Sequence, residues 1–475
     1  MGEEVVGGIS YGCSIIEKVF GGRRVVGARR EQPAGGVVEQ ERAVGQVVDG
    51  HDWSQPAFDD LAEQVRAAGE RWGDGDPPAS ALVDAVAALE RLATTVAAVQ
   101  LDVVAALTAR QRRDDAAAGI EQEVTDRAVA SMVGLARRTS PHQGARDREL
   151  AAVLRAELPT TRRAMLEGHG SRRHAEVVAR GTVFLSRAQR AVVDAEFGPH
   201  LGDLSVGRLR RRVSARAYAL DPEGHVAHIA RQREERHVSV RPTPDTMAVL
   251  SALLPATQAV AVWGALDRAA RSLRAAGDER SLAQLRADVL TERVTGQALA
   301  DGPVVELQVV VPAGAVFGGE AVLGALTDSD APATLVGHGP IPAPMARDLV
   351  RRAQRCTLRR LLVDPESGTL VDRDARRRTF SRADRDLLVA RDETCRTPWC
   401  DAPVREADHV EPWAAGGPTT PDNGQGLCQH CNQVKNHPAW DTVPQLDARG
   451  RQTSVETTTP SGHRYTSPTR RLVGA

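Results

Sequence analysis

Four of the six cysteines form two close pairs in the last fifth of the 475-residue chain. Four residues separate Cys395 from Cys400, and two residues separate Cys428 from Cys431. Two such pairs brought together supply four thiolates in a tetrahedron, which is the ligand set of structural zinc. Because four cysteines close the coordination sphere, this Zn²⁺ would hold a short segment folded and take no part in hydrolysis. Disulfides are the competing interpretation, but nothing in the sequence indicates an oxidising compartment.

The residues between the two cysteine pairs include types that could hydrolyse a phosphodiester. Such hydrolysis needs an activated water and a way to neutralise the charge of the transition state. Asp408 offers a hard carboxylate oxygen suited to Mg²⁺ or Mn²⁺, and His409 can accept a proton near neutral pH. Neighbouring residues of a regular strand point to opposite faces, so this pair can share a site only where the strand bends or ends.

The segment from Cys395 to Trp440 resembles the HNH family, also called the ββα-metal nucleases. The resemblance rests on the Asp-His pair in ADHVEPW, the Asn in PDNGQGLC and the pattern CxxCNxxK, in this order between and after the cysteine pairs. It implies that His409 is the general base for water. It also implies that Asn423 hydrogen-bonds backbone near that base and fixes its loop.

The catalytic metal site follows from the same resemblance. Asp408 and Asn432 would bind the divalent ion, Mg²⁺ or Mn²⁺, and Lys435 could contact a flanking phosphate. Family members often have a third histidine where this chain has Asn432, so the chain is an HNN variant whose amide oxygen favours harder ions. His430 and His437 lie close by and could substitute, although His430 sits between two zinc ligands and should point elsewhere.

Each of these assignments has a plainer alternative. Asp408 and Glu411 could be surface charges, and His409 a core histidine with its hydrogen bonds satisfied. Asn423 lies in the turn sequence Asp-Asn-Gly, and Asn432 could cap the start of a helix. The three tryptophans of this region are expected to pack its small core: Trp399, Trp413 and Trp440.

The remaining sequence predicts a mainly α protein with a small α/β unit, followed by a zinc-stapled ββα-metal module at the C-terminus. Apolar residues recur at helical spacing from residue 80 onward, whereas HVSVRP and VVELQVVVP have the pattern of strands. The predicted segments are a weakly ordered extension (1–41), a helical domain (42–235), the α/β unit (236–355), a hairpin and helix linker (356–392), the nuclease module (393–441) and a polar tail (442–475).

Residues from about Arg42 to Arg355 resemble the domain-of-unknown-function 222 family, which precedes HNH modules in many high-GC bacterial proteins. The resemblance rests on LSRAQRAVVDAEF, LSVGRLRRRVSARAYALDPEG, the run from HVSVRPTPD to LSALLP, and GPIPAPMARDL. It carries no activity. One helical pair, AVASMVGLARRTSPHQGARDREL, has the rhythm of a helix-turn-helix, for which packing is the favoured role and DNA reading the alternative.

Composition and charge bound the class of protein. Hydrophobic residues make up 41% and charged residues 26%, as in ordinary soluble proteins, and no basic segment followed by an apolar stretch indicates a secretion signal. We therefore expect a cytoplasmic protein that does not associate with membranes. The net charge is −1, but from Arg347 to Arg391 there are 13 arginines against 7 acids, which could bind a phosphate backbone.

Three functions remain open from the sequence. The first is a metal-dependent HNH endonuclease that hydrolyses DNA phosphodiester bonds. The second is a zinc-folded module that binds nucleic acid without cutting it, which the charge of residues 395–440 favours, three cations against five acids. The third is a protein-interaction scaffold built on the helical region.

Overall fold

The computed structural model describes residues 56–70, 77–296, 304–312, 333–335, 339–342, 344–345, 348, 355–363 and 378–470. The chain divides into two compact units, residues 1–79 and 80–475. In the described part of the first unit, α1 (Pro56–Glu70) is an amphipathic helix. The predicted weakly ordered extension, residues 1–41, lies outside the described residues.

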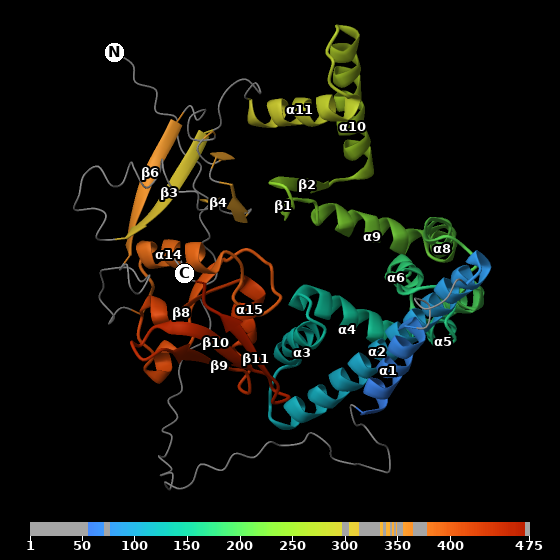
Figure 1. Cartoon of the computed structure of the whole chain (residues 1–475). Coiled ribbons are helices and arrows are strands. Elements are labelled where there is room, and N and C mark those ends of the chain that lie inside the picture. The colour runs from blue at the N-terminus through green and yellow to red at the C-terminus, as the bar shows by residue number, and fades with distance from the viewer. Residues whose placement is uncertain are drawn as a thin grey trace. The chain divides into compact units, whose positions relative to one another are not determined.

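The second unit begins with a run of helices, as predicted (Figure 1). These helices are α2 (Ala79–Ala117), α3 (Gln122–Ala136), α4 (Pro141–Ala156), α5 (Pro159–Leu166), α6 (Arg172–Gly181), α7 (Arg187–Phe197), α8 (Val206–Leu220) and α9 (Pro222–Glu234). The apolar faces of α2 to α8 meet in one core, mainly of Ala, Val and Leu side chains, which includes Leu101, Val133 and Leu209. Such small side chains suit a sequence with only 3% aromatic residues.

Helix α2 is the long helix that the apolar spacing predicted, and it extends over 39 residues. By length and composition alone it could cross a membrane. One such helix is weak evidence, because the core helix of a soluble protein has the same composition. Here Ala98, Leu101 and Val104 pack into the helical core.

Helices α3 and α4 are the pair whose sequence resembles a helix-turn-helix. Ser140 caps α4 by accepting a hydrogen bond from the Gln143 backbone N–H. A Cβ atom at Gly144 would lie 2.0 Å from the Ala130 carbonyl oxygen, so glycine is what allows the two helices to approach. Residues 128–135 of α3 are all buried, so this first helix of the pair serves packing. The DNA-reading alternative concerns the second helix, α4, and stays a prediction.

The α/β segment contains β1 (His237–Thr243) and β2 (Met247–Leu253), which form an antiparallel hairpin. Two helices follow, α10 (Ala256–Ala275) and α11 (Leu282–Thr295). Then β3 (Val304–Pro312) pairs in parallel with β6 (Arg355–Val363), and the short strands β4 (Ala333–Leu335) and β5 (Gly339–Ile341) pair with each other. The sequence predicted that 358–363 begins a hairpin, but its described part pairs with β3 instead, and the rest of the predicted hairpin lies outside the described residues.

The C-terminal region is built on a hairpin and a short helix. After α14 (Arg382–Asp392) come β7 (Glu406–His409), β8 (Gly424–Leu427) and α15 (Gln429–Val434), the predicted ββα order. The segment predicted as a polar tail forms an antiparallel sheet in its described part: β9 (Asp441–Leu446), β10 (Gln452–Thr458) and β11 (Arg464–Pro468). Gln452 and Thr457 are buried along β10 beside Val455, so two of these three buried side chains are polar.

Candidate active site

Asp408 and His409 occupy the last two positions of β7, opposite Gln425 and Gly424 of β8. Because β7 ends at His409, the alternation of a regular strand does not continue beyond this residue, which is the condition that the sequence set for a shared site. The hairpin is closely packed: a Cβ atom at Gly424 would lie 3.0 Å from Leu388 and Phe380. This packing places the start of β8, which pairs with the end of β7, against α14.

The four clustered cysteines lie together at the base of this hairpin. Their Sγ atoms are all within 4.8 Å of one another, and all four residues are buried. The Cys400 Sγ lies 3.8 Å from that of Cys428 and 3.7 Å from that of Cys431. A Zn–S bond of ~2.3 Å in a tetrahedron gives sulfur separations of ~3.8 Å, so the cluster has the dimensions of a zinc site. Hydrogen bonds from the other thiols hold the pKa of Cys428 below its ordinary value.

His409 is held by a hydroxyl and an aromatic ring. Its Nε2 lies 2.8 Å from Thr419 Oγ1, and its ring centroid lies 4.6 Å from that of Phe380. Burial lowers the pKa of His409; the Asp408 carboxylate opposes this shift, and the Lys435 ammonium adds to it. A lowered pKa keeps the imidazole neutral near pH 7, the protonation state that a general base needs.

Asn423 ties together the two ends of the loop that follows His409. It is buried, and its Oδ1 accepts from the Glu411 backbone N–H at 2.9 Å. Its Nδ2 donates to the carbonyls of Glu411 at 3.0 Å and Pro418 at 2.9 Å. Asn423 also ends the short 3-10 helix η4 (Pro421–Asn423), so it is a turn residue and a loop tether at once.

Helix α15 carries Asn432 and ends at Lys435, which contacts the hairpin. The N-cap of α15 is Cys428, whose sulfur accepts from the Cys431 backbone N–H, so the alternative of Asn432 as a cap is wrong. Lys435 donates to the Asp408 carboxylate and to the His409 carbonyl oxygen. The Lys435 ammonium, which was predicted to contact a flanking phosphate, therefore pairs with the Asp408 carboxylate. That carboxylate was predicted to bind the catalytic ion.

A buried ion cluster that the sequence did not reveal joins α14 to the hairpin. The Asp392 carboxylate accepts from Arg391 at 2.7 Å, from Arg396 at 2.7 Å and from the Gly426 backbone N–H at 2.7 Å. Burial acts to raise the pKa of Asp392, but the charges of the two arginines outweigh it and leave the pKa below its usual value. Arg391 also donates to the Gly424 carbonyl, so this arginine of the predicted basic surplus stabilises the module rather than facing a phosphate.

Two histidines near α15 contact the helical core rather than the hairpin. His430 Nε2 lies 3.1 Å from Ser131 Oγ of α3. His437 is fully buried, and its Nε2 lies 3.0 Å from the Asp115 carboxylate at the end of α2. The alternative in which His437 substitutes as a catalytic metal ligand is therefore not supported, and His430 points elsewhere, as expected.

The Asp115 carboxylate is the centre of this contact. Besides His437, it accepts from Thr125 Oγ1 at 2.7 Å and from Gln111 Nε2 at 2.9 Å. Burial acts to raise its pKa, and these hydrogen bonds outweigh burial and leave the pKa lowered. Arg127 of α3 adds a bond to Gln433 of α15 at 3.0 Å. Helix α3 thus contacts α15, the helix that carries Asn432, and α2 contacts His437 just after that helix.

We expect the change His437→Ala to lower the free energy of unfolding of the C-terminal region by about 1–3 kcal/mol, because it leaves the buried Asp115 carboxylate short of a partner. The measurement is urea unfolding followed by tryptophan fluorescence. His200→Ala is the matched control, since His200 also faces a carboxylate, that of Asp203 at 2.9 Å, but on the exposed surface. Equal midpoints for both variants would contradict the contact.

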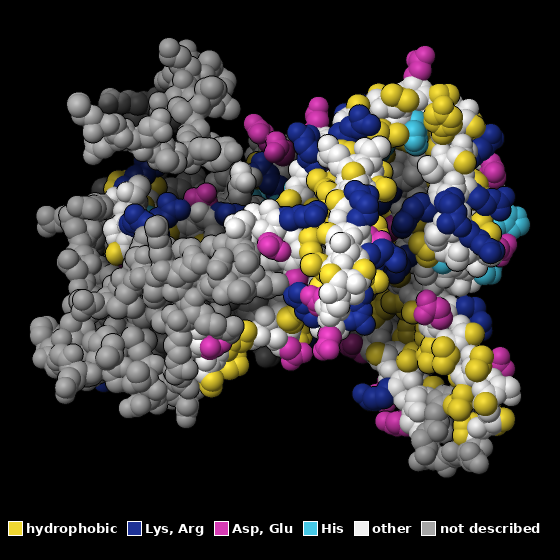
Figure 2. All heavy atoms as spheres, turned by 90° about the horizontal axis from the view of Figure 1, so that it is seen from above, with side chains coloured by type: hydrophobic (Ala, Val, Ile, Leu, Met, Phe, Trp, Pro, Cys, Tyr) yellow, Lys and Arg dark blue, Asp and Glu magenta, His cyan; other side chains and the backbone are white. Residues whose placement is uncertain are grey.

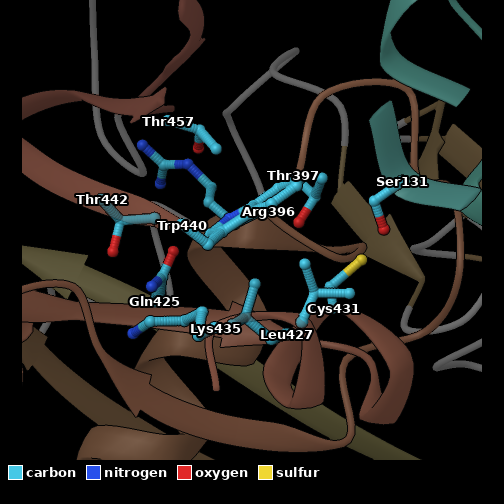
Figure 3. A pocket seen from close by; sticks show the side chains of 11 residues that line it. Ser131, Arg396, Thr397, Gln425, Leu427, Cys431, Lys435, Trp440, Thr442 and Thr457 are labelled. Atoms are coloured by element: carbon cyan, nitrogen blue, oxygen red, sulfur yellow. The ribbon is translucent and has the colours of Figure 1, made fainter. Parts of the chain in front are cut away.

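The three tryptophans were predicted to pack the small core of the module, and none of them does so. Trp399 and Trp413 are 41% and 45% exposed, whereas Trp440 packs against the helical core. Trp440 also lines a small pocket with Gln425, Lys435 and Ser131 (Figure 3). Neither Asp408 nor His409 is among the described residues that line this pocket, so the pocket is a gap between packed elements and not the candidate active site.

Two known families match the chain, one after the other. The family described as "Domain of unknown function (DUF222)" matches residues 84–392, and the family described as "HNH endonuclease" matches residues 395–437. The predicted order of the two regions is confirmed. An HNH endonuclease domain is therefore present beside a four-cysteine cluster that could bind zinc.

The chain is also similar to curated mycobacterial proteins along most of its length. It is 28% identical over 443 residues to "Uncharacterized protein Rv3776" of Mycobacterium tuberculosis (strain ATCC 25618 / H37Rv), covering 82% of this chain and 80% of that protein. It is 27% identical over 446 residues to "Uncharacterized protein MT2160" (strain CDC 1551 / Oshkosh) and to "Uncharacterized protein Rv2100" (strain ATCC 25618 / H37Rv), covering 82% of this chain and 77% of each. None of the solved structures matches at a significant level.

Proposed function

Because the chain belongs to the domain-of-unknown-function 222 family and ends in an HNH endonuclease domain, we propose that it is a metal-dependent endonuclease acting on DNA. The observation that carries the proposal is the placement of His409. Its neutral imidazole lies at the end of β7, next to the Asp408 carboxylate and held by Thr419. A buried thiolate cluster supports the same hairpin.

In the proposed reaction His409 Nδ1, the ring nitrogen that is not bonded to Thr419, takes a proton from the attacking water. Thr419 orients the ring, and Asn423 holds the loop that follows it. Asp408 and Asn432 offer two oxygen donors, a set that fits Mg²⁺ or Mn²⁺. When bound, such an ion supplies charge neutralisation at the phosphate and at the departing 3′ oxygen. The expected products are 5′-phosphate and 3′-hydroxyl ends.

The structural metal is proposed to be Zn²⁺. The sulfur separations fit its tetrahedron, and four thiolates leave no open position for a water. The cysteines thus hold β8 and α15 together, while the oxygen donors of Asp408 and Asn432 belong to a second, catalytic ion. The two sites differ in chemistry, so one metal cannot serve both.

The proposal is tested by nicking of supercoiled plasmid with Mg²⁺ or Mn²⁺, comparing the zinc-loaded wild type with Asp408→Asn. The wild type should nick only with the added ion. Asp408→Asn removes the carboxylate charge and should lose most of this activity at low metal concentration. Asp401→Asn, an exposed acid of the same module, is the matched control and should cut like the wild type. Failure of the wild type to nick would refute the proposal.

A catalytically silent nucleic-acid-binding module is the second candidate. It is favoured by the Lys435 ammonium, which pairs with Asp408 and so balances the charge that a catalytic ion would neutralise. Titration of Mn²⁺ into zinc-loaded protein separates the two candidates. The endonuclease should show a second metal site that is lost in Asp408→Ala, and a silent module should show none.

A further inference from the structure

The nuclease module has little positive charge available for DNA. In residues 395–440, all described, three cations stand against five acids. Arg396 is buried against Asp392, and Lys435 is paired with Asp408, which leaves Arg405 as the exposed cation of this segment. Affinity for DNA comes mainly from cations that neutralise phosphates. A DNA-cutting chain of this kind needs basic surface from elsewhere.

Helix α8 carries such a surface. Its 15 residues include five arginines and no acid, in a chain whose net charge is −1. Leu209, Val213 and Ala217 form its buried face. The opposite face carries three exposed arginines at positions i, i+3 and i+4, which lie side by side on a helix: Arg208, Arg211 and Arg212.

The side chains of this arginine face are not used in ion pairs. Within the described part of the chain, Arg216 pairs with Glu196, but no carboxylate pairs with Arg208, Arg211 or Arg212. Arg212 lies over the Phe197 ring at 5.8 Å, a contact that leaves its charge uncompensated. Figure 2 shows Arg and Lys side chains, in dark blue, on the right-hand side of the view, the side on which α8 lies in Figure 1, with acidic and hydrophobic side chains among them.

The framework under this face is rigid. Helix α6 packs directly against α8, because a Cβ atom at Gly181 would lie 2.7 Å from Val213 Cγ1. Ser205 caps α8 by accepting from the Arg208 backbone N–H, which fixes the start of the helix. Three guanidinium groups on a fixed helix match the spaced charges of a phosphate backbone and supply no sequence readout.

We propose that the α8 arginine face (Arg208, Arg211 and Arg212) binds the phosphate backbone of duplex DNA and supplies affinity that the HNH module lacks. The inference rests on the proposed function, because an endonuclease supplies the reason for a DNA contact. It assigns a role to the helical region, which would hold the duplex while the module cuts it.

The test is the salt dependence of duplex binding by the full chain, measured by fluorescence anisotropy without added Mg²⁺ or Mn²⁺. Each neutralised phosphate contributes about 0.9 to the slope of log K against log salt concentration, so the triple change to Gln should reduce that slope by about 2 to 3. The triple change to Lys keeps the charge and should retain the slope. Contributions from arginines at 347–391 persist in both variants and do not obscure the difference.

The matched control removes three exposed arginines that are already paired with acids: Arg110→Gln, Arg271→Gln and Arg280→Gln. It changes the net charge equally and should leave the slope unchanged. An equal fall in slope for this control, or no fall for the α8 variant, would overturn the inference. The inference would also be overturned if the triple change to Gln abolished binding to anionic phospholipid vesicles but not binding to DNA. That result would indicate a membrane surface as the partner.

The outcomes separate this inference from the proposed function. If the wild type binds duplex through the α8 arginine face but never nicks it, the endonuclease proposal fails and the binding surface stands. If the wild type nicks DNA and the slope does not depend on α8, the endonuclease proposal stands and this inference fails.

Discussion

Replacement of His409 by Ala is expected to lower the rate of plasmid nicking by about 10²–10⁴-fold, the usual contribution of a general base. Without the imidazole, the attacking water has no proton acceptor at the end of β7. The effect should fall on kcat rather than on DNA binding, because the ring does not supply charge near pH 7. The measurement is single-turnover nicking at saturating protein, with duplex affinity determined in parallel.

Two comparisons make this result specific to His409. His463→Ala changes an exposed histidine that bonds Ser461 in the C-terminal sheet, and it should cut like the wild type. The zinc content of His409→Ala should remain that of the wild type, which excludes loss of the fold as the cause. Equal cutting by wild type and His409→Ala would remove His409 from the mechanism.

The second large effect is expected from the cysteine cluster. Cys431→Ser removes one of four thiolates and should abolish zinc binding and unfold the module, since structural zinc contributes about 10–16 kcal/mol in small zinc-folded peptides. A typical domain is stable by only about 5–15 kcal/mol, so the remaining contacts cannot compensate. Because Cys431 lies in α15, the change should also displace Asn432 and Lys435 and abolish nicking.

Zinc content is measured by a colorimetric assay after denaturation, and folding of the module by tryptophan fluorescence. Cys13→Ser is the control, because Cys13 is remote in sequence from the two cysteine pairs. The control should hold as much zinc as the wild type. Full zinc content and an unchanged unfolding transition in Cys431→Ser would show that the cluster does not bind the metal.

Features that depend on residues close together in the chain could be predicted from the sequence. The spacing of the four cysteines predicted a cluster whose sulfur atoms are within 4.8 Å of one another, and the apolar period of α2 predicted its helix. The ββα order followed from the resemblance of residues 395–440. These features depend on contacts within a few turns or on a motif whose residues are close in sequence.

Features that depend on distant partners were not predictable. The pairing of β3 with β6 joins strands more than 40 residues apart, and its parallel register cannot be read from a single strand. The sheet of β9–β11 buries Thr457 and Gln452, residue types that in sequence indicate a solvated tail. In the sequence, Asp392 is one of many charged residues in an arginine-rich segment, and only the fold shows that its carboxylate is buried.

The contacts of α3 with α15 and of α2 with His437 affect how the chain can be divided. A fragment cut out at residue 393 would lose Asp392, the partner of the buried Arg396, and Asp115, the partner of the buried His437. A negative assay on such a fragment would report damage at the cut rather than the capacity of the intact chain. For the same reason, recombination that transferred the cysteine module to a foreign protein would separate it from the residues of α2 and α3 that it contacts. The two regions should therefore be inherited together.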